Sequence, residues 1–160
     1  MGAHIWWKWL TMPSTPWASL WIEKYENKRP TEELIRISDV SMGSLIWNSA
    51  KKHRNLIQQH SFWEVKDGDA ARFWEDTWQQ LPKLKDLLHP SQIEKQDLQD
   101  HNKVKNLWKP YPTQDYRKWL NAAQILRNGT EQAQKTLDTK LMKRKIQCSE
   151  EKDILRWGYG

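Results

Sequence analysis

The chain has 160 residues, with 12 Trp against 2 Phe, 29% charged residues and a net charge of +6. This length allows one domain or two small subdomains whose core rests on a few large rings. The single cysteine, Cys148, excludes an intrachain disulfide and cannot by itself supply a cysteine-rich zinc site.

The opening segment, MGAHIWWKWLTMP, is typical of a short helix rather than of a targeting signal. It is interrupted by Lys8, it is too short to span a membrane, and no small-residue cleavage pattern follows it. Together with the lone cysteine, this predicts an intracellular protein, in the nucleus or the cytoplasm, with no membrane partner.

Two further segments of the first half have helical spacing of Trp and other apolar residues. STPWASLWIEKY offers Ser14 or Thr15 as a cap and Pro16 as the first helical residue. SLIWNSAKKHRNLIQQH has an apolar face and a basic face, and the basic face consists of Lys51, Lys52 and Arg54. We therefore expect a mainly α fold in which these three cations are available to a ligand.

The segment FWEVKDGDAARFWEDTW, residues 62–78, changes from helical to strand-like spacing. Asp67-Gly68 is a strong turn signal, because Gly tolerates the positive φ of a tight turn. We predict one small β-hairpin at about 62–74, clamped to helices by large rings that favour a core over a ligand site. The motif residues are Trp63, Gly68, Phe73, Trp74, Asp76 and Trp78.

Carboxylates cluster in the same segment, at Asp67, Asp69, Glu75 and Asp76. Such a cluster is compatible with a divalent metal, but DGD equally suits a turn and EDTW a helix start. The five histidines show no ligand spacing, and we find no Gly-rich phosphate loop or catalytic serine motif. We predict no metal, no cofactor and no catalytic residue.

The second half carries the excess of positive charge, with 16 Lys and Arg against 10 Asp and Glu in residues 81–160. Prolines indicate a linker at 91–112, between a Trp-rich helical region at 1–90 and a basic helical region at 113–160. The charge excess favours a polyanionic partner, although exposed helices are commonly Lys-rich for solubility alone.

Two helices are expected in the basic region, separated at Gly129. Thr113 caps the first helix, and Thr130 begins the second. The basic run of Lys143, Arg144 and Lys145, with Trp157 as a ring for base stacking, is a candidate nucleic-acid contact. Taken alone, this run fits a solvated helix end slightly better.

The stretch from Gly43 to Leu87 closely resembles a segment of plant LINE-type, non-LTR retrotransposon polyproteins. That segment has the signature W-x-V-G-[DN]-G-x-x-x-x-F-W-x-D-x-W, and the chain departs from it at Lys66, where the family usually has Gly. The matching residues are Trp63, Val65, Asp67, Gly68, Phe73, Trp74, Asp76 and Trp78. Upstream matches to its Trp-rich helices are Trp6, Trp7, Trp9, Trp17, Lys24 and Tyr25, and downstream matches to the start of its zinc-binding domain are Asp153 and Trp157.

The resemblance implies a Trp-rich helical connector between the reverse-transcriptase core and the zinc-binding reverse-transcriptase domain. The sequence contains no [FY]-A-D-D polymerase motif, no Cys and His set for the zinc-binding region and no ribonuclease H carboxylate set. A polymerase needs its paired aspartates to hold two metal ions at the transferring phosphate. We therefore expect no enzymatic activity from this chain alone.

Three functional hypotheses follow from these features. The first is a retrotransposon-derived fragment that contacts RNA or DNA weakly and without sequence preference, through basic side chains and stacking rings. The second is a domesticated plant module that binds a host protein through a Trp-rich surface. The third is a remnant without function.

Overall fold

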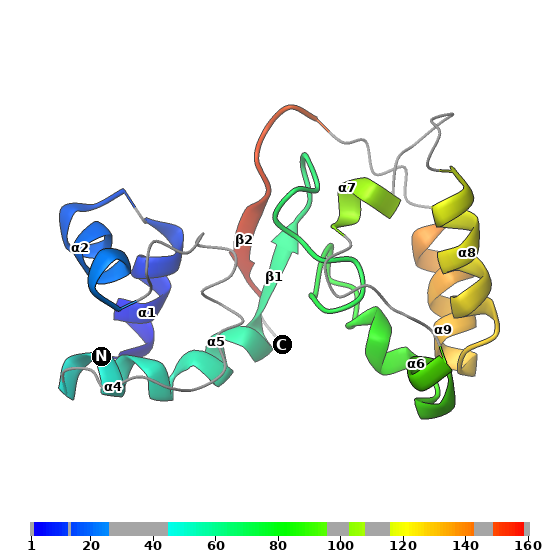
Figure 1. Ribbon diagram of the computed structural model, residues 1–160, viewed down its shortest axis with the longest axis horizontal. Coiled ribbons are helices and arrows are strands. Elements are labelled where there is room, and N and C mark those ends of the chain that lie inside the picture. The colour runs from blue at the N-terminus through cyan, green and yellow to red at the C-terminus, as the bar shows by residue number, and fades with distance from the viewer. Residues whose placement is uncertain are drawn as a thin grey trace. The chain divides into compact units, whose positions relative to one another are not determined.

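The computed structural model describes residues 2–12, 14–25, 45–95, 103–107, 116–142 and 149–158 (Figure 1). The chain forms two compact units, which are treated separately below. Unit 1 comprises Met1–Ser61 and Trp157–Gly160, and unit 2 comprises Phe62–Arg156. The domain divisions expected near residues 90 and 112 stay a prediction from prolines and composition.

The prediction of a mainly α fold with one small β element is confirmed. The helices of unit 1 are α1 (Gly2–Thr11), α2 (Pro16–Tyr25), α4 (Leu45–Lys52) and α5 (Arg54–His60). The helical elements of unit 2 are η1 (Leu84–Leu87), α6 (Pro90–Lys95), α7 (Val104–Leu107), α8 (Tyr116–Arg127), α9 (Glu131–Thr136) and η2 (Leu137–Leu141). A two-stranded sheet joins β1 (Ser61–Glu64) to β2 (Ile154–Trp157).

The core of unit 1 is built on the tryptophans of α1. Trp6 and Trp9 are buried, and their ring centroids are 4.8 Å apart. The indole N–H of Trp9 donates to the carbonyl of Ala18 at 3.3 Å, which attaches α1 to α2. Helix α2 begins at Pro16, as expected, because its fixed φ suits the first helical position. Helices α4 and α5 pack against α1 and complete this unit.

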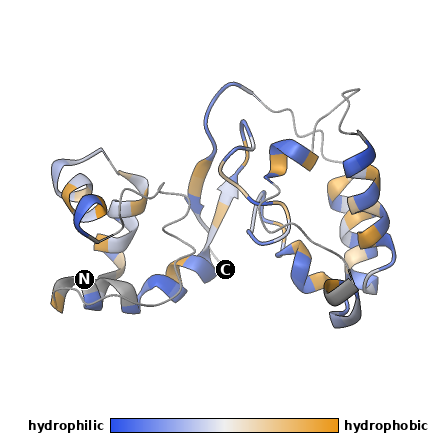
Figure 2. Cartoon of the chain, viewed as in Figure 1, coloured by the Kyte–Doolittle hydropathy of each residue, from blue (hydrophilic) through white to orange (hydrophobic). Residues whose placement is uncertain are grey.

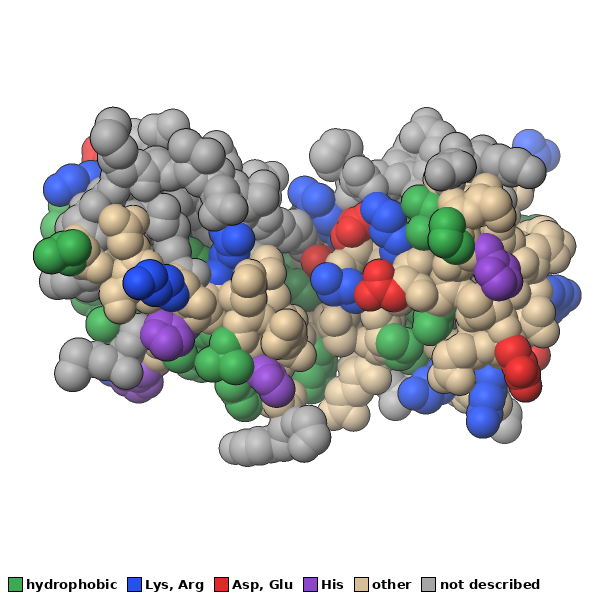
Figure 3. Space-filling model, turned by 90° about the horizontal axis from the view of Figure 1, so that it is seen from below, with side chains coloured by type: hydrophobic (Ala, Val, Ile, Leu, Met, Phe, Trp, Pro, Cys, Tyr) green, Lys and Arg blue, Asp and Glu red, His purple; other side chains and the backbone are tan. Residues whose placement is uncertain are grey.

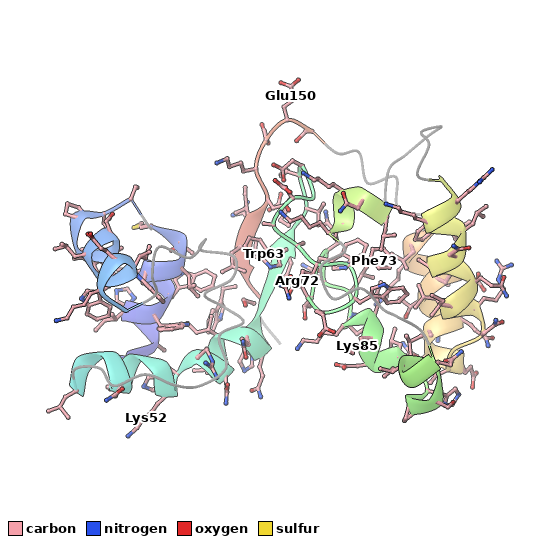
Figure 4. The ribbon with its side chains drawn as sticks, in the orientation of Figure 1. Lys52, Trp63, Arg72, Phe73, Lys85 and Glu150 are labelled. Carbon is pink, nitrogen blue, oxygen red and sulfur yellow. The ribbon has the colours of Figure 1, made fainter. Side chains whose placement is uncertain are left out.

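The core of unit 2 gathers around Phe73. Its fully buried ring contacts Trp74 and Trp78, at centroid distances of 4.9 and 5.5 Å, and Trp119 of α8 at 6.1 Å. The indole N–H of Trp78 donates to the carbonyl of Phe73 at 3.0 Å, so this large ring is buried without an orphaned donor. The motif rings therefore belong to the core, and Figure 4 shows Phe73 pointing toward α8.

The second strand of the sheet is not the one expected. Residues 62–64 form a strand as predicted, but its partner is β2. Residues 70–74 form bends and turns, in which Arg72 makes an isolated antiparallel bridge to Lys103, instead of a second hairpin strand. The physical reason lies in the carboxylate of Asp153, which accepts hydrogen bonds from the backbone N–H groups of Lys66, Gly68, Ala70 and Ala71. Four donors of this segment are therefore satisfied by one side chain rather than by a neighbouring strand.

Gly68 takes the left-handed conformation expected of the turn, with φ of 72°. A Cβ atom there would also lie 2.7 Å from the backbone nitrogen of Lys105, so two constraints select glycine. The same nitrogen donates to the carbonyl of Gly68 at 3.0 Å. The turn is thus fixed by a chain segment 37 positions away in sequence, as well as by local preference.

Helices α8 and α9 agree with the expected pair around Gly129. The hydroxyl of Thr130 accepts a hydrogen bond from the N–H of Ala133 at 3.2 Å, which caps α9, and donates to the carbonyl of Leu87 at 2.7 Å. The inner sides of these helices carry buried apolar residues such as Leu126 of α8 and Ala133 of α9. Figure 2 shows hydrophobic and hydrophilic residues on different sides of α8.

Candidate nucleic-acid interface

Three of the predicted contact residues lie at the junction of α4 and α5 in unit 1. Lys52 is exposed at the end of α4, and Arg54 is half-buried at the start of α5. Lys51 is part of α4, but its side chain lies outside the described residues. We call these three residues the α4–α5 surface. Figure 4 shows Lys52 pointing away from α1.

This surface is basic because its helices contain no acidic residue. Residues 45–60 include three Lys and Arg and two His but neither Asp nor Glu. Ile57 is fully buried and fixes the inward side of α5, whereas Asn55 and Gln59 are exposed. Figure 3, which faces α4 and α5, shows Lys, Arg and His side chains on this side of the unit. The surface therefore offers cations and amide groups to solvent.

Arg54 is half-buried, and one donor of its guanidinium has no partner in the described part of the chain. Its Nε atom is buried and makes no hydrogen bond to a described residue. A buried donor left unsatisfied costs about 1–3 kcal/mol. The planar guanidinium is also suited to binding phosphate through two parallel hydrogen bonds.

Trp157 lies in the same unit, against the other end of α5. Its ring stacks on the imidazole of His60, with centroids 5.9 Å apart and planes at 24°, and meets the edge of Trp7 at 5.3 Å and 85°. The N–H of Gly158 donates to the carbonyl of His60 at 2.6 Å and fixes this arrangement. Trp157 as a whole is half-buried.

The structure brings Trp157 against His60, about a hundred positions earlier in the sequence. Trp157 was expected to act with Lys143, Arg144 and Lys145, but that run lies outside the described residues. Trp157 instead shares a unit with Lys52 and Arg54. Sequence reasoning missed His60 as its stacking partner, because the pairing of β1 with β2 leaves no local signal.

The carboxylates weighed as a metal site are engaged with cations and backbone groups. Asp69 binds the ammonium groups of Lys103 and Lys105 at 2.8 and 2.7 Å, and these hydrogen bonds lower the pKa of Asp69 to about 2. Asp76 accepts the N–H of Arg72 at 2.8 Å, and Glu75 pairs with Lys85. Within the described ranges, no group of three His, Cys, Asp or Glu residues is placed to hold a metal ion.

A second charged group links the two strands in unit 2. Glu64 binds Arg156 at 2.6 Å and Lys66 at 3.1 Å, and the hydrogen bonds to these cations, that of Arg156 first, lower the pKa of Glu64. These pairs are partly exposed, so each contributes little to the free energy of unfolding. The cations of this group are matched by carboxylates.

Searches of protein-family models, curated proteins and solved structures found no match to this chain. None of the described helices has both the length and the apolar character needed to cross a membrane.

Proposed function

We propose that the chain binds RNA or DNA weakly and without sequence preference through the α4–α5 surface and Trp157. The observation that carries this proposal is the absence of acidic residues from 45–60, which leaves Lys52 and Arg54 without an opposing carboxylate on their own helices. In unit 2, by contrast, Lys103 and Lys105 share Asp69. Cations on a protein surface bind phosphates with release of counterions.

The physical roles of the proposed residues differ. Lys51 and Lys52 act as point charges along a phosphate backbone, whereas the guanidinium of Arg54 makes directed hydrogen bonds to a phosphate oxygen. The accessible part of Trp157 stacks on an unpaired base, which any of the four bases satisfies. This combination favours single strands, because unpaired bases are needed for stacking.

The resemblance to retrotransposon polyproteins gives this activity a context. We propose a reverse-transcriptase-related fragment that lacks the catalytic core and acts as a connector beside a template or primer, in the nucleus or the cytoplasm. The same reasoning predicts no DNA synthesis by the chain itself.

Fluorescence anisotropy of a labelled single-stranded RNA tests the proposal. We expect saturable binding at low salt, and we expect the double variant K52E/R54E to bind at least about tenfold more weakly. The matched control is K135E/K140E, which makes the same change of charge at two exposed residues of α9 and η2 in unit 2. Equal losses in both variants would show that only the overall charge matters and would contradict the proposed surface.

A host-protein partner is the alternative, and exposed apolar residues of unit 1 favour it. Leu45, Leu20 and Met12 are exposed by 89%, 65% and 53%. A folded wild-type chain that retains neither RNA nor DNA at low salt would exclude the nucleic-acid proposal. A single stoichiometric protein partner that survives nuclease treatment of a plant extract would then support the alternative.

A further inference from the structure

The side chain of Asp153 is bound in unit 2 by four backbone donors. Its Oδ1 atom accepts the N–H groups of Lys66 at 2.6 Å and Gly68 at 2.8 Å. Its Oδ2 atom accepts those of Ala70 at 2.9 Å and Ala71 at 3.3 Å. Both oxygens of one carboxylate are therefore held by residues 66–71, which we call the oxyanion loop.

The oxyanion loop is shaped by contacts that do not involve Asp153. The carbonyl of Gly68 accepts the N–H of Lys105 at 3.0 Å, and the carbonyl of Ala71 accepts the N–H of Val104 at 2.8 Å. With Gly68 in the left-handed region, the N–H groups of Lys66, Gly68, Ala70 and Ala71 converge on one carboxylate, which resembles the backbone nests that bind anions. The donors are thus held in position by α7 and the loop itself, whatever occupies them.

Charged side chains of both signs surround the oxyanion loop, which itself contains Asp67 and Asp69. The ammonium groups of Lys103 and Lys105 lie on the adjacent segment and bind Asp69. The hydrogen bond to Asp69 raises the pKa of Lys105, and attraction to Asp67 and Asp153 raises it further. The cation of Lys105 is therefore close enough to interact with the carboxylate that fills the loop.

We propose that the oxyanion loop is a receptor for a small oxyanion with two anionic oxygens on one centre, which Asp153 occupies in cis. The ligand would be a carboxylate or a phosphate. Either group can present one oxygen to the N–H groups of Lys66 and Gly68 and a second oxygen to those of Ala70 and Ala71. Asp153 directly precedes β2, so occupation of the loop holds this strand in place. An external oxyanion that replaces Asp153 releases that restraint.

Removal of the tethered carboxylate tests the receptor, with formate and phosphate as separate probes. In D153A, we expect each saturating probe to shift the backbone amide resonances of Lys66, Gly68, Ala70 and Ala71, relative to sodium chloride of equal ionic strength. In the wild type, we expect binding at least about tenfold weaker, because the tethered carboxylate competes at an effective concentration on the order of millimolar or higher. The relative response to the two probes distinguishes a carboxylate receptor from a phosphate receptor.

The neutral variant D153N keeps the experiment informative if D153A does not fold in chloride. Its amide oxygen accepts some of the four donors without charge, so phosphate or formate should displace it more readily than Asp153 and shift the same resonances. Recovery of folded D153A on adding either probe would also support the receptor. The proposal is overturned if folded D153A shows no response, or if D153A stays unfolded with both probes while folded D153N shows none.

Discussion

At the scale of single residues, Gln79 and Gln80 both lie in the left-handed backbone region, at φ of 50° and 58°. Hydrogen bonds of the turn impose this conformation, because the N–H of Gln79 donates to the carbonyl of Trp63 at 2.8 Å and the N–H of Leu81 to that of Trp78 at 2.9 Å. Gln79 has a compensating contact, since its side-chain amide donates to the carbonyl of Val65 at 3.2 Å. Gln80 is exposed.

We therefore expect Gln80→Gly to stabilise the chain. A left-handed conformation costs a residue with a Cβ about 1–2 kcal/mol, and glycine removes that cost while adding a smaller entropy cost in the unfolded state. The expected net gain is about 0.5–1 kcal/mol in the free energy of unfolding, measured by urea denaturation.

The matched control is Gln124→Gly, the same substitution at an exposed position inside α8. At this position glycine should lower the free energy of unfolding by about 1 kcal/mol. Gln124 is helical, so the substitution relieves no left-handed strain and only weakens the helix. If both variants lose stability to the same degree, the strain assigned to Gln80 is wrong.

At the scale of elements, helix α9 depends on a threonine that serves two partners. The hydroxyl of Thr130 caps α9 through Ala133 and donates to the carbonyl of Leu87 at the end of η1. We expect Thr130→Ala to lower the free energy of unfolding by about 1–2 kcal/mol, because it removes a helix cap and leaves a carbonyl without its donor. Thermal or urea denaturation measures this loss.

Thr130→Ser separates the hydroxyl from the methyl group at the same position. Serine keeps both hydrogen bonds, so this variant should retain most of the stability. A serine variant as unstable as the alanine variant would assign the effect to packing of the methyl group instead.

Elements defined by local signals could be predicted from the sequence, whereas the pairing of strands could not. Pro16 begins α2, Gly129 and Thr130 separate α8 from α9, and Gly68 is left-handed, each as the local residue preferences indicate. Strand β1 instead pairs with β2, about ninety residues further on. Local alternation cannot distinguish that partner from residues 70–74, because the choice depends on where the donors of the oxyanion loop find an acceptor.

The candidate site was predictable to a similar extent. Lys52 and Arg54 could be selected because helical spacing places cations away from the apolar face that includes Ile57. The stacking of Trp157 on His60 depends on the register of the sheet, so no local pattern indicates it. The four hydrogen bonds of Asp153 also depend on that register, so no local pattern in the sequence indicates them. A lone acidic residue before a short strand has many possible partners.

At the scale of the whole molecule, the net charge of +6 does not determine how many cations touch a nucleic acid. Salt dependence measures that number. For a single strand, log K falls with log salt concentration with a slope of about −0.7 for each phosphate neutralised. The three cations of the α4–α5 surface alone predict a slope of about −2, and the addition of Lys143, Arg144 and Lys145 predicts about −4.

We expect a slope near −2 for the wild type, because the proposed contact consists of the α4–α5 surface and Trp157, and an unchanged slope for a variant with Lys143, Arg144 and Lys145 changed to Gln. Anisotropy titrations of the same RNA at four or more salt concentrations, on the order of 50 to 200 mM, give both values. A wild-type slope near −4 that falls to about −2 in the triple variant would contradict this restriction and would add Lys143, Arg144 and Lys145 to the contact. A slope near zero would show that phosphates are not the ligand, since binding to phosphates must release counterions.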